Sequence, residues 1–301
     1  MTGARILIGV DAGATHTTAA VADANGTVLV RAEGGPGAVR PGGAAAAAER
    51  IRATCADAMS KAFREVRGDV LVVGAAGAGR EEERLALEAA LEALRIAPRV
   101  HVTTDGAIAL QSAFGDAAGI VLIAGTGSIA WARLPGGEMA RVGGLGPVLG
   151  DPGSGYDLGR AALRAVGLAL EGRGPRSALA DTLLRRLHLR DLDELVRWAA
   201  AADVPTVAAL AADVLAAAAE ADGVASAIAD AGADELARHV GALAGRFGRD
   251  APVQVALGGG LLARSEEYRR RVAARVLADV PAAEIRPEAV DAVLGAIHLA
   301  R

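Results

Sequence analysis

The sequence is poor in aromatic residues, which make up only 2% of its 301 positions, although 52% of its residues are hydrophobic. Much of the apolar content is alanine, which packs elements closely but contributes little transfer free energy per residue. We therefore expect many helices with thin side-chain layers between them. A chain of this length is about right for two ordinary domains, since domains contain roughly 100 to 200 residues.

Cysteine is almost absent as well. The single cysteine, Cys55, excludes an internal disulfide and any all-cysteine metal or iron–sulfur site built from one chain, and it fits a reducing cytoplasm. No run of residues approaches the roughly 20 apolar positions that span a bilayer, and the start of the sequence lacks a long apolar stretch before a cleavage site. The sequence thus predicts a cytoplasmic protein with no membrane partner.

Concentrated positive charge is also missing. The net charge is -4, whereas nucleic acids and acidic membranes require clustered basic residues, so we expect a small-molecule partner and no nucleic acid. The only lysine, Lys61, lies in Met-Ser-Lys-Ala, outside any Gly-Lys-Ser/Thr motif, which excludes a P-loop. The glycines of residues 74–79 are spaced GxxGxG rather than GxGxxG, which is more typical of a tight crossover than of a dinucleotide site.

The order strand, turn, strand, hairpin, strand occurs twice in the sequence. Residues 5–10, 18–22 and 27–32 form the first set, with an Asn25-Gly26 hairpin signal, and residues 119–124, 129–133 and 138–142 form the second. A polar turn rich in glycine and threonine follows the first strand in each set. The repeated order predicts an internal duplication.

The remaining segments alternate between helix and strand. Between the two sets we expect helices at 43–66, 80–94 and 106–114 and strands at 69–74 and 99–103; after them, residues 154–248 read as almost continuous helix, and strand 252–257 and helices 265–279 and 287–300 follow. This alternation predicts right-handed crossovers and partly parallel sheets. We expect an N-terminal lobe of residues 1–115 and a C-terminal lobe of residues 116–301 with a helical insertion at about 155–250.

Two turns are candidates for phosphate binding, because backbone N–H groups reach phosphate oxygens where side chains are absent. The turn that begins at Asp11 combines a carboxylate with Gly13 and Thr15, which suits a magnesium-bound water and phosphate oxygens. The turn Gly125-Thr126-Gly127-Ser128 offers donors without negative charge. Either turn alone is more often a structural hairpin, but two at the same place in a duplicated unit favour a clamp on one polyphosphate.

Five segments together resemble a known family. They are IGVDAGATHTTAAVAD, VTTDGAIAL, VLIAGTGSIAW, RVGGLGPVLGDPGSGYDLGR and VALGGGLLARSE, which spread over residues 8 to 266. The pattern resembles the sugar kinase, Hsp70 and actin superfamily, and specifically the BadF/BadG/BcrA/BcrD-type ATPase and N-acetylglucosamine kinase family. The resemblance implies an α/β fold of two ribonuclease-H-like lobes with a nucleotide cleft between them, ATP and Mg²⁺ as cofactors, and a homodimer.

The resemblance also implies roles for the glycine-rich turns. Asp11 would hold Mg²⁺, through water, and the phosphates of ATP would contact Gly13, Thr15, Gly125, Thr126 and Gly127. The glycines Gly258, Gly259 and Gly260, which follow an apolar strand, would belong to the adenosine pocket. A helix-entry turn is the alternative structural interpretation of these three glycines.

Asp105 ends one strand and opens a helix, which is where open α/β sheets place ligand-binding groups. At that position an aspartate can also act as a helix N-cap, and the two roles can coexist. In the resembling kinases the aspartate of Thr-Thr-Asp is the catalytic base that accepts the hydroxyl proton, so the resemblance implies this role for Asp105, beside the sugar substrate.

The glycine-rich segment from 143 to 155 is typical of a mobile or ligand-lining loop. In the amino-sugar kinases that match it, the positions of Gly144, Leu145 and Asp151 lie at the sugar, and an aspartate can accept two hydroxyl hydrogen bonds. Three positions depart from those kinases: Leu145 replaces an aromatic, Ala38 replaces a sugar-contacting asparagine, and Pro152 replaces a glutamate. These departures leave open which amino sugar is the acceptor, with N-acetylglucosamine or glucosamine expected, and which hydroxyl is phosphorylated.

Two other functions occur on related folds. An activase of 2-hydroxyacyl-CoA dehydratases needs two cysteines per subunit for its bridging iron–sulfur cluster, and Cys55 stands alone, so we set it aside. A nucleotide-dependent ATPase or regulatory binding protein without a sugar acceptor stays an alternative, because Ala38 and Leu145 remove contacts to a sugar. The five histidines show no ligand spacing, and we interpret all of them as non-catalytic.

Overall fold

The computed structural model describes residues 5–62, 68–248 and 251–301, and the chain forms two compact units. Unit 1 contains the chain up to Ala117 together with Val290–Arg301, and unit 2 contains Ala118–Ala289. The sequence-based division had placed residues 290–301 in the second lobe. The structure corrects this assignment, because the last helix completes the core of unit 1.

Unit 1 is built on a five-stranded sheet with the order β3-β2-β1-β4-β5 in the described ranges. Its strands β1, β2 and β3 are antiparallel neighbours, whereas β1, β4 and β5 are parallel. The elements are β1 (Leu7–Ala12), β2 (Thr17–Ala22), β3 (Val28–Gly34), α1 (Ala44–Ala62), β4 (Val70–Ala75), α2 (Glu81–Ala93), β5 (Val100–Thr104), α3 (Asp105–Phe114) and α12 (Ala292–Ala300).

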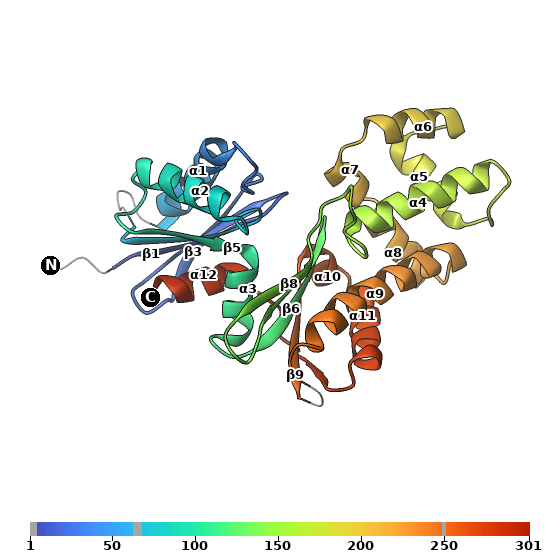
Figure 1. The fold of residues 1–301 in the computed structure, drawn as a ribbon. Coiled ribbons are helices and arrows are strands. Elements are labelled where there is room, and N and C mark those ends of the chain that lie inside the picture. Colours follow the sequence, from blue (N-terminus) through green and yellow to red (C-terminus); the bar gives the residue numbers. More distant parts are fainter. Residues whose placement is uncertain (1–4, 63–67, 249–250) are drawn as a thin grey trace. The chain divides into compact units, whose positions relative to one another are not determined.

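Helices cover both faces of this sheet, with α1 and α2 on one side and α3 and α12 on the other (Figure 1). The alternation of side chains along β1 explains the two layers, because successive residues of a strand point to opposite faces. Ile8 packs with α1 and α2, whereas its neighbour Leu7 packs with α3 and α12. Each face therefore has its own apolar core.

The last helix, α12, packs closely against α3. Val293, Ala296 and Ile297 are buried between the helix and the sheet. At Gly295 a Cβ would overlap the carbonyl oxygen of Ile108, so only glycine allows the two helices to approach this closely. This contact explains why the C-terminal segment belongs to unit 1.

Unit 2 repeats the architecture. Its sheet order is β10-β9-β6-β7-β8 in the described ranges, with antiparallel β6, β7 and β8 and parallel β6, β9 and β10. The order and directions match those of unit 1 and confirm the predicted internal duplication. The strands are β6 (Gly119–Ala124), β7 (Ser128–Arg133), β8 (Met139–Gly143), β9 (Val253–Gly258) and β10 (Ala283–Ile285).

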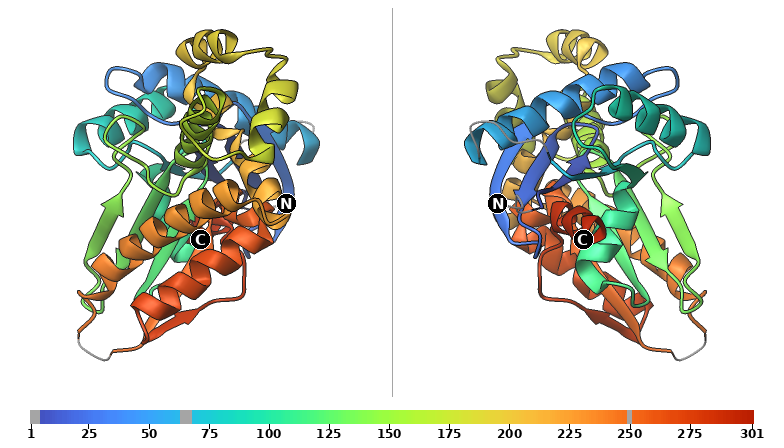
Figure 2. Two further views of the ribbon diagram at one scale, coloured as in Figure 1. Left: turned by 90° about the vertical axis from the view of Figure 1, so that its right-hand side faces the viewer. Right: turned by 90° about the vertical axis from the view of Figure 1, so that its left-hand side faces the viewer.

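From residue 155 to residue 244 the chain is mostly helical, as the sequence predicts for residues 154–248. The helices of unit 2 are α4 (Gly155–Leu170), α5 (Ala178–Leu187), α6 (Leu192–Ala201), α7 (Val204–Ala208), α8 (Ala211–Ala219), α9 (Gly223–Ala244), α10 (Gly260–Arg264) and α11 (Glu266–Asp279). Both views in Figure 2 show α9 and α11 side by side. Within the described ranges no single helix is long and apolar enough to cross a bilayer; the pair Val204–Ala219 and Gly223–Ala244 passes that test only together and is bent by 116°.

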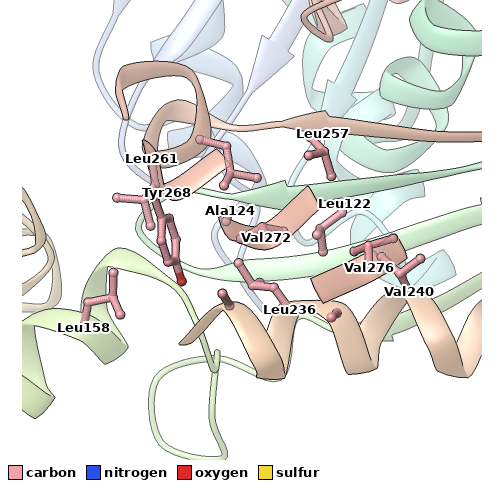
Figure 3. Packing of buried hydrophobic residues seen from close by; sticks show 14 of the residues in the cluster. Leu122, Ala124, Leu158, Leu236, Val240, Leu257, Leu261, Tyr268, Val272 and Val276 are labelled. Carbon is pink, nitrogen blue, oxygen red and sulfur yellow. The ribbon is translucent and has the colours of Figure 1, made fainter. Parts of the chain in front are cut away.

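The core of unit 2 is centred on α9, α11 and the sheet. Figure 3 shows Tyr268 of α11 reaching past Leu261 toward Leu158, with Leu236 and Val272 nearby. Tyr268 is fully buried, and its hydroxyl donates a hydrogen bond to the carbonyl oxygen of Gly153 at 2.9 Å. This bond links the core to the glycine-rich loop that precedes α4.

The packing of α12 generates a stability prediction. Ile297→Ala removes a fully buried side chain from unit 1 and leaves a cavity, so we expect the free energy of unfolding to fall by roughly 2 to 5 kcal/mol. The matched control is Leu299→Ala on the same helix, whose side chain is 41% exposed and whose truncation is expected to have little effect. Urea unfolding followed by circular dichroism measures both, and equal losses for the two variants would contradict the placement of α12.

Candidate functional site

In unit 1 the parallel strands bring the predicted residues to one edge of the sheet. Asp11 pairs in register with Gly74, and Gly74 pairs with Thr103. The carboxyl ends of β1, β4 and β5 therefore meet at the same edge, where open α/β sheets bind ligands. This edge holds Asp11, the turn after β1 and Asp105 at the start of α3.

The turn after β1 is shorter than the sequence predicts. Strand β1 continues to Ala12 and β2 begins at Thr17, so the turn contains Gly13 to His16, closed by a hydrogen bond from Gly13 N to His16 O of 2.9 Å. Thr15 is exposed in this turn. The N–H groups of Gly37 and Ala38 both donate to Gly13 O at 3.0 Å. The segment that carries Ala38 is thus fixed beside the candidate phosphate turn.

The N-cap of α3 is Thr104 and not Asp105. The hydroxyl oxygen of Thr104 accepts a hydrogen bond from Ala107 N at 3.0 Å, and Asp105 is the first helical residue. The proposed capping role of Asp105 is therefore wrong, because the helix begins one residue earlier than the sequence suggests. The carboxylate of Asp105 accepts a hydrogen bond from Gly106 N at 2.8 Å, and the side chain is only partly buried.

Three carboxylates approach one another at this edge. Burial, together with the negative charges of Asp105 and Asp291, raises the pKa of Asp11 to about 7. Asp291 precedes α12 and forms an ion pair with Arg31 of β3 at 2.6 Å. No sequence signal pointed to Asp291, because only the packing of α12 against the sheet brings it near Asp11.

The chemistry of this edge suits a hard divalent cation. Carboxylate oxygens are the side-chain ligands that Mg²⁺ prefers, and Mg²⁺ keeps several waters while it contacts one or two carboxylates and phosphate oxygens. In the part of the chain that the structure describes, no group of three or more acidic, histidine or cysteine side chains forms a ready metal cage. Asp11 therefore fits Mg²⁺ that is held through water and by a nucleotide rather than by the protein alone.

In unit 2 the turn Gly125–Gly127 joins β6 to β7 and is hydrogen-bonded to the start of α4. Gly125 N donates to Gly127 O at 2.9 Å, Gly155 N donates to Gly125 O at 2.8 Å, and Tyr156 N donates to Thr126 O at 3.2 Å. The candidate phosphate turn therefore has a fixed backbone. Its three residues are only partly buried, so it is accessible to a ligand.

The glycines Gly258 to Gly260 lie beside this turn. Strand β9 runs parallel to β6, with Gly258 in register with Ile123, so the two strands end at the same edge. Gly259 has a φ of 91°, and a Cβ there would overlap the backbone of Ala124 at the end of β6. The backbone of Gly259 therefore reaches the entry of the phosphate turn, an approach that only glycine permits.

The loop from 143 to 155, which we call the sugar loop, is tied to the same turn. A carboxylate oxygen of Asp151 accepts a hydrogen bond from Gly146 N at 3.1 Å, and the other lies 2.7 Å from where a Cβ on Gly127 would stand. The hydroxyl of Ser128 donates to Pro152 O at 2.8 Å. The turn Gly125–Gly127 and the loop that carries Asp151 are thus held together within unit 2.

The start of the sugar loop is equally constrained. Gly144 N donates to Ser128 O at 2.9 Å, and Gly144 has a φ of 67°. Leu145 follows with 58% of its surface exposed, and Val148 is 92% exposed. Burial raises the pKa of the Asp151 carboxyl. The loop therefore presents apolar side chains to solvent while it holds its carboxylate half-buried.

The structure brings the predicted site residues together in two groups, each described within its own unit. Unit 1 gathers Asp11, Gly13, Thr15 and Asp105 at one sheet edge; unit 2 gathers Gly125, Thr126, Gly127, Gly144, Leu145, Asp151, Gly258, Gly259 and Gly260. Sequence reasoning missed Asp291 and also His239, which is buried in α9 against the start of the sugar loop. An isolated histidine in an apolar helix gives no sequence signal for such a place.

Comparison with known proteins shows a family match over nearly the whole chain. A sequence model of the BadF/BadG/BcrA/BcrD ATPase family matches residues 8–300. Two curated relatives are the N-acetyl-D-glucosamine kinase of Dictyostelium discoideum, 32% identical over 207 residues, and the N-acetylmuramic acid/N-acetylglucosamine kinase of Clostridium acetobutylicum, 28% identical over 195 residues. Each alignment covers 64% of this chain and 64% of the relative, so the chain matches less than two thirds of those proteins.

Solved structures agree with the sequence comparison. A Chromobacterium violaceum protein, provisionally assigned as an N-acetylglucosamine kinase, has 29% sequence identity and a TM-score of 0.82, with 99% of both chains covered. The likeness extends over both units, and it confirms the predicted α/β fold of two actin-like lobes.

The acidic edge of unit 1 generates a pH prediction. An acid whose pKa is raised on folding binds its proton more tightly in the folded protein, so the stabilisation is complete below the usual pKa of 3.8 and is lost as the pH rises to about 7. Asp11→Asn imitates the protonated acid at every pH. We expect Asp11→Asn to gain stability relative to the unmodified protein between pH 4 and pH 8, by more than about 1 kcal/mol.

Chemical unfolding at the two pH values, in buffer without nucleotide or Mg²⁺, measures this difference. Asp57→Asn, which changes an exposed carboxylate on α1, is the control and should show no such trend. If the free energy of unfolding of Asp11→Asn differs from that of the unmodified protein by the same amount at pH 4 and pH 8, the pKa of Asp11 is not raised by folding.

Proposed function

Because the chain belongs to the BadF/BadG/BcrA/BcrD ATPase family, we propose that it is an ATP-dependent kinase that transfers the γ-phosphate of ATP to a hydroxyl group of an amino sugar. The observation that carries the proposal is the attachment of the sugar loop to the phosphate turn in unit 2, through Ser128, Asp151 and Gly155. One rigid body thereby offers groups for a polyphosphate and groups for a polyhydroxyl acceptor. N-acetylglucosamine or glucosamine is the acceptor we favour.

In this proposal the turns of both units contact the phosphates of ATP. Gly13 and Thr15 contribute from unit 1, and Gly125, Thr126 and Gly127 contribute from unit 2 through their N–H and hydroxyl groups. The adenosine binds at Gly258 to Gly260, and the approach of Gly259 to the end of β6 supports this assignment, because it puts an open backbone turn directly beside the phosphate turn.

Asp11 is the residue that would hold Mg²⁺, through water. When bound, Mg²⁺ would neutralise the negative charge that develops on the phosphate oxygens during transfer. The raised pKa of Asp11 supports this role, because a carboxyl crowded by Asp105 and Asp291 gains most from a nearby cation.

Asp105 acts as the general base. The acceptor hydroxyl oxygen forms a bond to the γ-phosphorus, its proton passes to the Asp105 carboxylate, and the bond from the γ-phosphorus to the bridging oxygen breaks, so that ADP leaves with the electron pair. The start of α3 favours the charged carboxylate there, because free N–H groups at a helix N-terminus carry partial positive charge. The protein otherwise mainly positions the reactants, which can supply much of the acceleration.

The acceptor is bound by the sugar loop. Asp151 accepts hydrogen bonds from two sugar hydroxyls, Gly144 contributes backbone contact, and Leu145 covers an apolar part of the sugar. Ala38 offers no polar side-chain group where related kinases have asparagine, although its N–H is fixed beside the phosphate turn. Recognition therefore depends more on the sugar loop in this chain than in those relatives.

The same departures support a second candidate, a nucleotide-dependent ATPase or regulatory binding protein of this fold without a sugar acceptor. Such a protein would hydrolyse or bind ATP whether or not a sugar is present. A homodimer and a cytoplasmic location are part of the kinase proposal, and sedimentation of the purified protein tests the dimer.

The test of the proposed function is a coupled assay of ADP release with Mg²⁺-ATP and, in turn, glucosamine, N-acetylglucosamine, N-acetylmuramic acid and glucose. We expect at least one amino sugar to raise ADP release well above the rate without sugar. If none of these sugars raises it, the kinase assignment fails, and a constant background rate would favour the second candidate.

The mechanism predicts a specific loss for Asp105→Asn. Without the base, sugar-dependent ADP release should fall by roughly 10²–10⁴-fold, while ATP binding, measured by calorimetry, stays within about twofold. Asp116→Asn, an exposed aspartate just after α3, is the matched control and should keep its activity. Full activity of Asp105→Asn with a true acceptor would show that another group accepts the proton.

A further inference from the structure

Arg264 is the last residue of α10, the short helix that begins at Gly260. Side chains on a helix point back toward its N-terminus, and residues four apart are neighbours on its surface, so the side chain of Arg264 can return to Gly260. The structure shows this contact directly, because a Cβ on Gly260 would lie 3.1 Å from both terminal guanidinium nitrogens of Arg264. The guanidinium therefore borders the space that a side chain at Gly260 would fill.

Gly260 in turn lies beside the candidate phosphate turn of unit 2. Its backbone nitrogen is 3.7 Å from the place where a Cβ on Gly125 would stand. The preceding residue, Gly259, lies against the backbone of Ala124, the last residue of β6. Arg264 thus lies against the residue that borders the phosphate turn, and all of these contacts are within one unit.

The donors of Arg264 are available to a ligand. Its side chain is exposed, and it has no ion pair with any other residue that the structure describes. A second arginine, Arg269 of α11, also reaches the end of β9, but its guanidinium donates to main-chain carbonyl oxygens, among them Leu257 O at 3.0 Å. Arg269 therefore holds the end of the strand in place, whereas Arg264 has no such task.

A polyphosphate at this turn calls for positive charge as well as N–H groups. The turn Gly125–Gly127 carries no charge, and the carboxylate of Asp151 beside Gly127 is negative. The single lysine of the sequence, Lys61, belongs to α1 in unit 1, so a permanent cation near this turn has to be an arginine. The planar guanidinium also matches phosphate, because two of its N–H groups can bond two phosphate oxygens at once.

We propose that Arg264 is a nucleotide-binding residue whose guanidinium pairs with the α-phosphate. The inference rests on the proposed function, which assigns adenosine to Gly258–Gly260 and the phosphates to Gly125–Gly127. The α-phosphate is the one attached to adenosine, so it belongs where these two groups of residues meet. Arg264 lies against Gly260 at that place. Its charge would make unit 2 select nucleotides over nucleosides.

The pair AMP and adenosine isolates this contact, because the two ligands differ only by the α-phosphate. Displacement of a fluorescent ADP analogue, at low salt and without sugar, measures their affinities. We expect Arg264→Gln to bind AMP and ADP about tenfold or more weakly than the unmodified protein, and adenosine within about twofold, since a hydrogen bond to a charged group is among the strong ones. An equal loss for AMP and adenosine, or no loss for AMP, overturns the inference.

Two further variants show whether the charge at this position is the cause. Arg264→Lys keeps a positive charge without the planar fork, so it should recover part of the AMP affinity that Arg264→Gln loses. The matched control is Arg270→Gln on α11, which removes the same charge from an exposed side chain paired with Glu266 on its own helix. The control should bind AMP as the unmodified protein does. No recovery in Arg264→Lys, or an equal loss in Arg270→Gln, contradicts a specific pairing.

The position of the guanidinium against Gly260 has a test of its own. Gly260→Ala keeps the arginine but adds a methyl group 3.1 Å from its guanidinium nitrogens, so the guanidinium has to move. We expect Gly260→Ala to weaken AMP binding when Arg264 is present and to have a clearly smaller effect in Arg264→Gln, because substitutions that disturb one shared interaction are not additive. The same fold-loss in both backgrounds would contradict this placement of Arg264.

These measurements need no sugar, so they separate the inference from the proposed function. If the unmodified protein binds ADP and Arg264→Gln binds it equally well, the Arg264 inference alone is wrong. If the unmodified protein binds neither ADP nor AMP, the nucleotide site of the proposed function fails, and the inference fails with it. Intact nucleotide binding without sugar-dependent ADP release overturns the kinase proposal, while a selective loss of AMP in Arg264→Gln still supports the role of Arg264.

Discussion

The parallel pairing of β1 with β4 in unit 1, and of β6 with β9 in unit 2, is the constraint on which the rest of the structure depends. Parallel neighbours end at the same edge of a sheet, so whatever follows each strand gathers there. In unit 1 this brings Asp11 to the edge where α3 begins with Asp105. In unit 2 it brings the turn after β6 beside Gly259. Because both sheets have the same topology, each unit gathers one candidate half-site at the same edge of its sheet.

The two half-sites differ in charge and in the segments to which their turns are bonded. Unit 1 presents three carboxylates, two of which act on Asp11, whereas the turn in unit 2 presents backbone donors. The turn in unit 2 is further tied to the sugar loop and, through Gly153 and the Tyr268 hydroxyl, to the core of the unit. A ligand that contacts Asp151 therefore acts on a body that already includes the phosphate turn.

Local signals in the sequence were sufficient for much of this picture. The turns at Asp11 and Gly125, the duplicated order of strands and the helical insertion all have short-range signatures, and the structure places them close to the predicted bounds. The predicted N-cap of α3 was wrong by one residue. Thr104 and Asp105 are both good capping residues, and only the hydrogen bond from Ala107 N to the Thr104 side chain identifies Thr104 as the cap. Strand β10 escaped prediction because three residues are too few to show an alternating pattern.

What the sequence could not supply depends on contacts between distant segments. Asp291 reaches Asp11 only because α12 returns to unit 1, where Gly295 fits against Ile108. His239 reaches the sugar loop because α9 packs under β8, and no local spacing marks it. Both residues are polar groups placed by packing, and they are the two additions that the structure makes to the candidate site.

The central claim is that the γ-phosphate of ATP is transferred to a sugar hydroxyl and not to water. The most direct measurement is ³¹P NMR of the protein with Mg²⁺-ATP and N-acetylglucosamine or glucosamine. The account predicts that the γ-phosphate resonance disappears as a sugar phosphomonoester resonance grows in equal amount. Inorganic phosphate as the only product, or ATP that stays intact with both sugars, would contradict it.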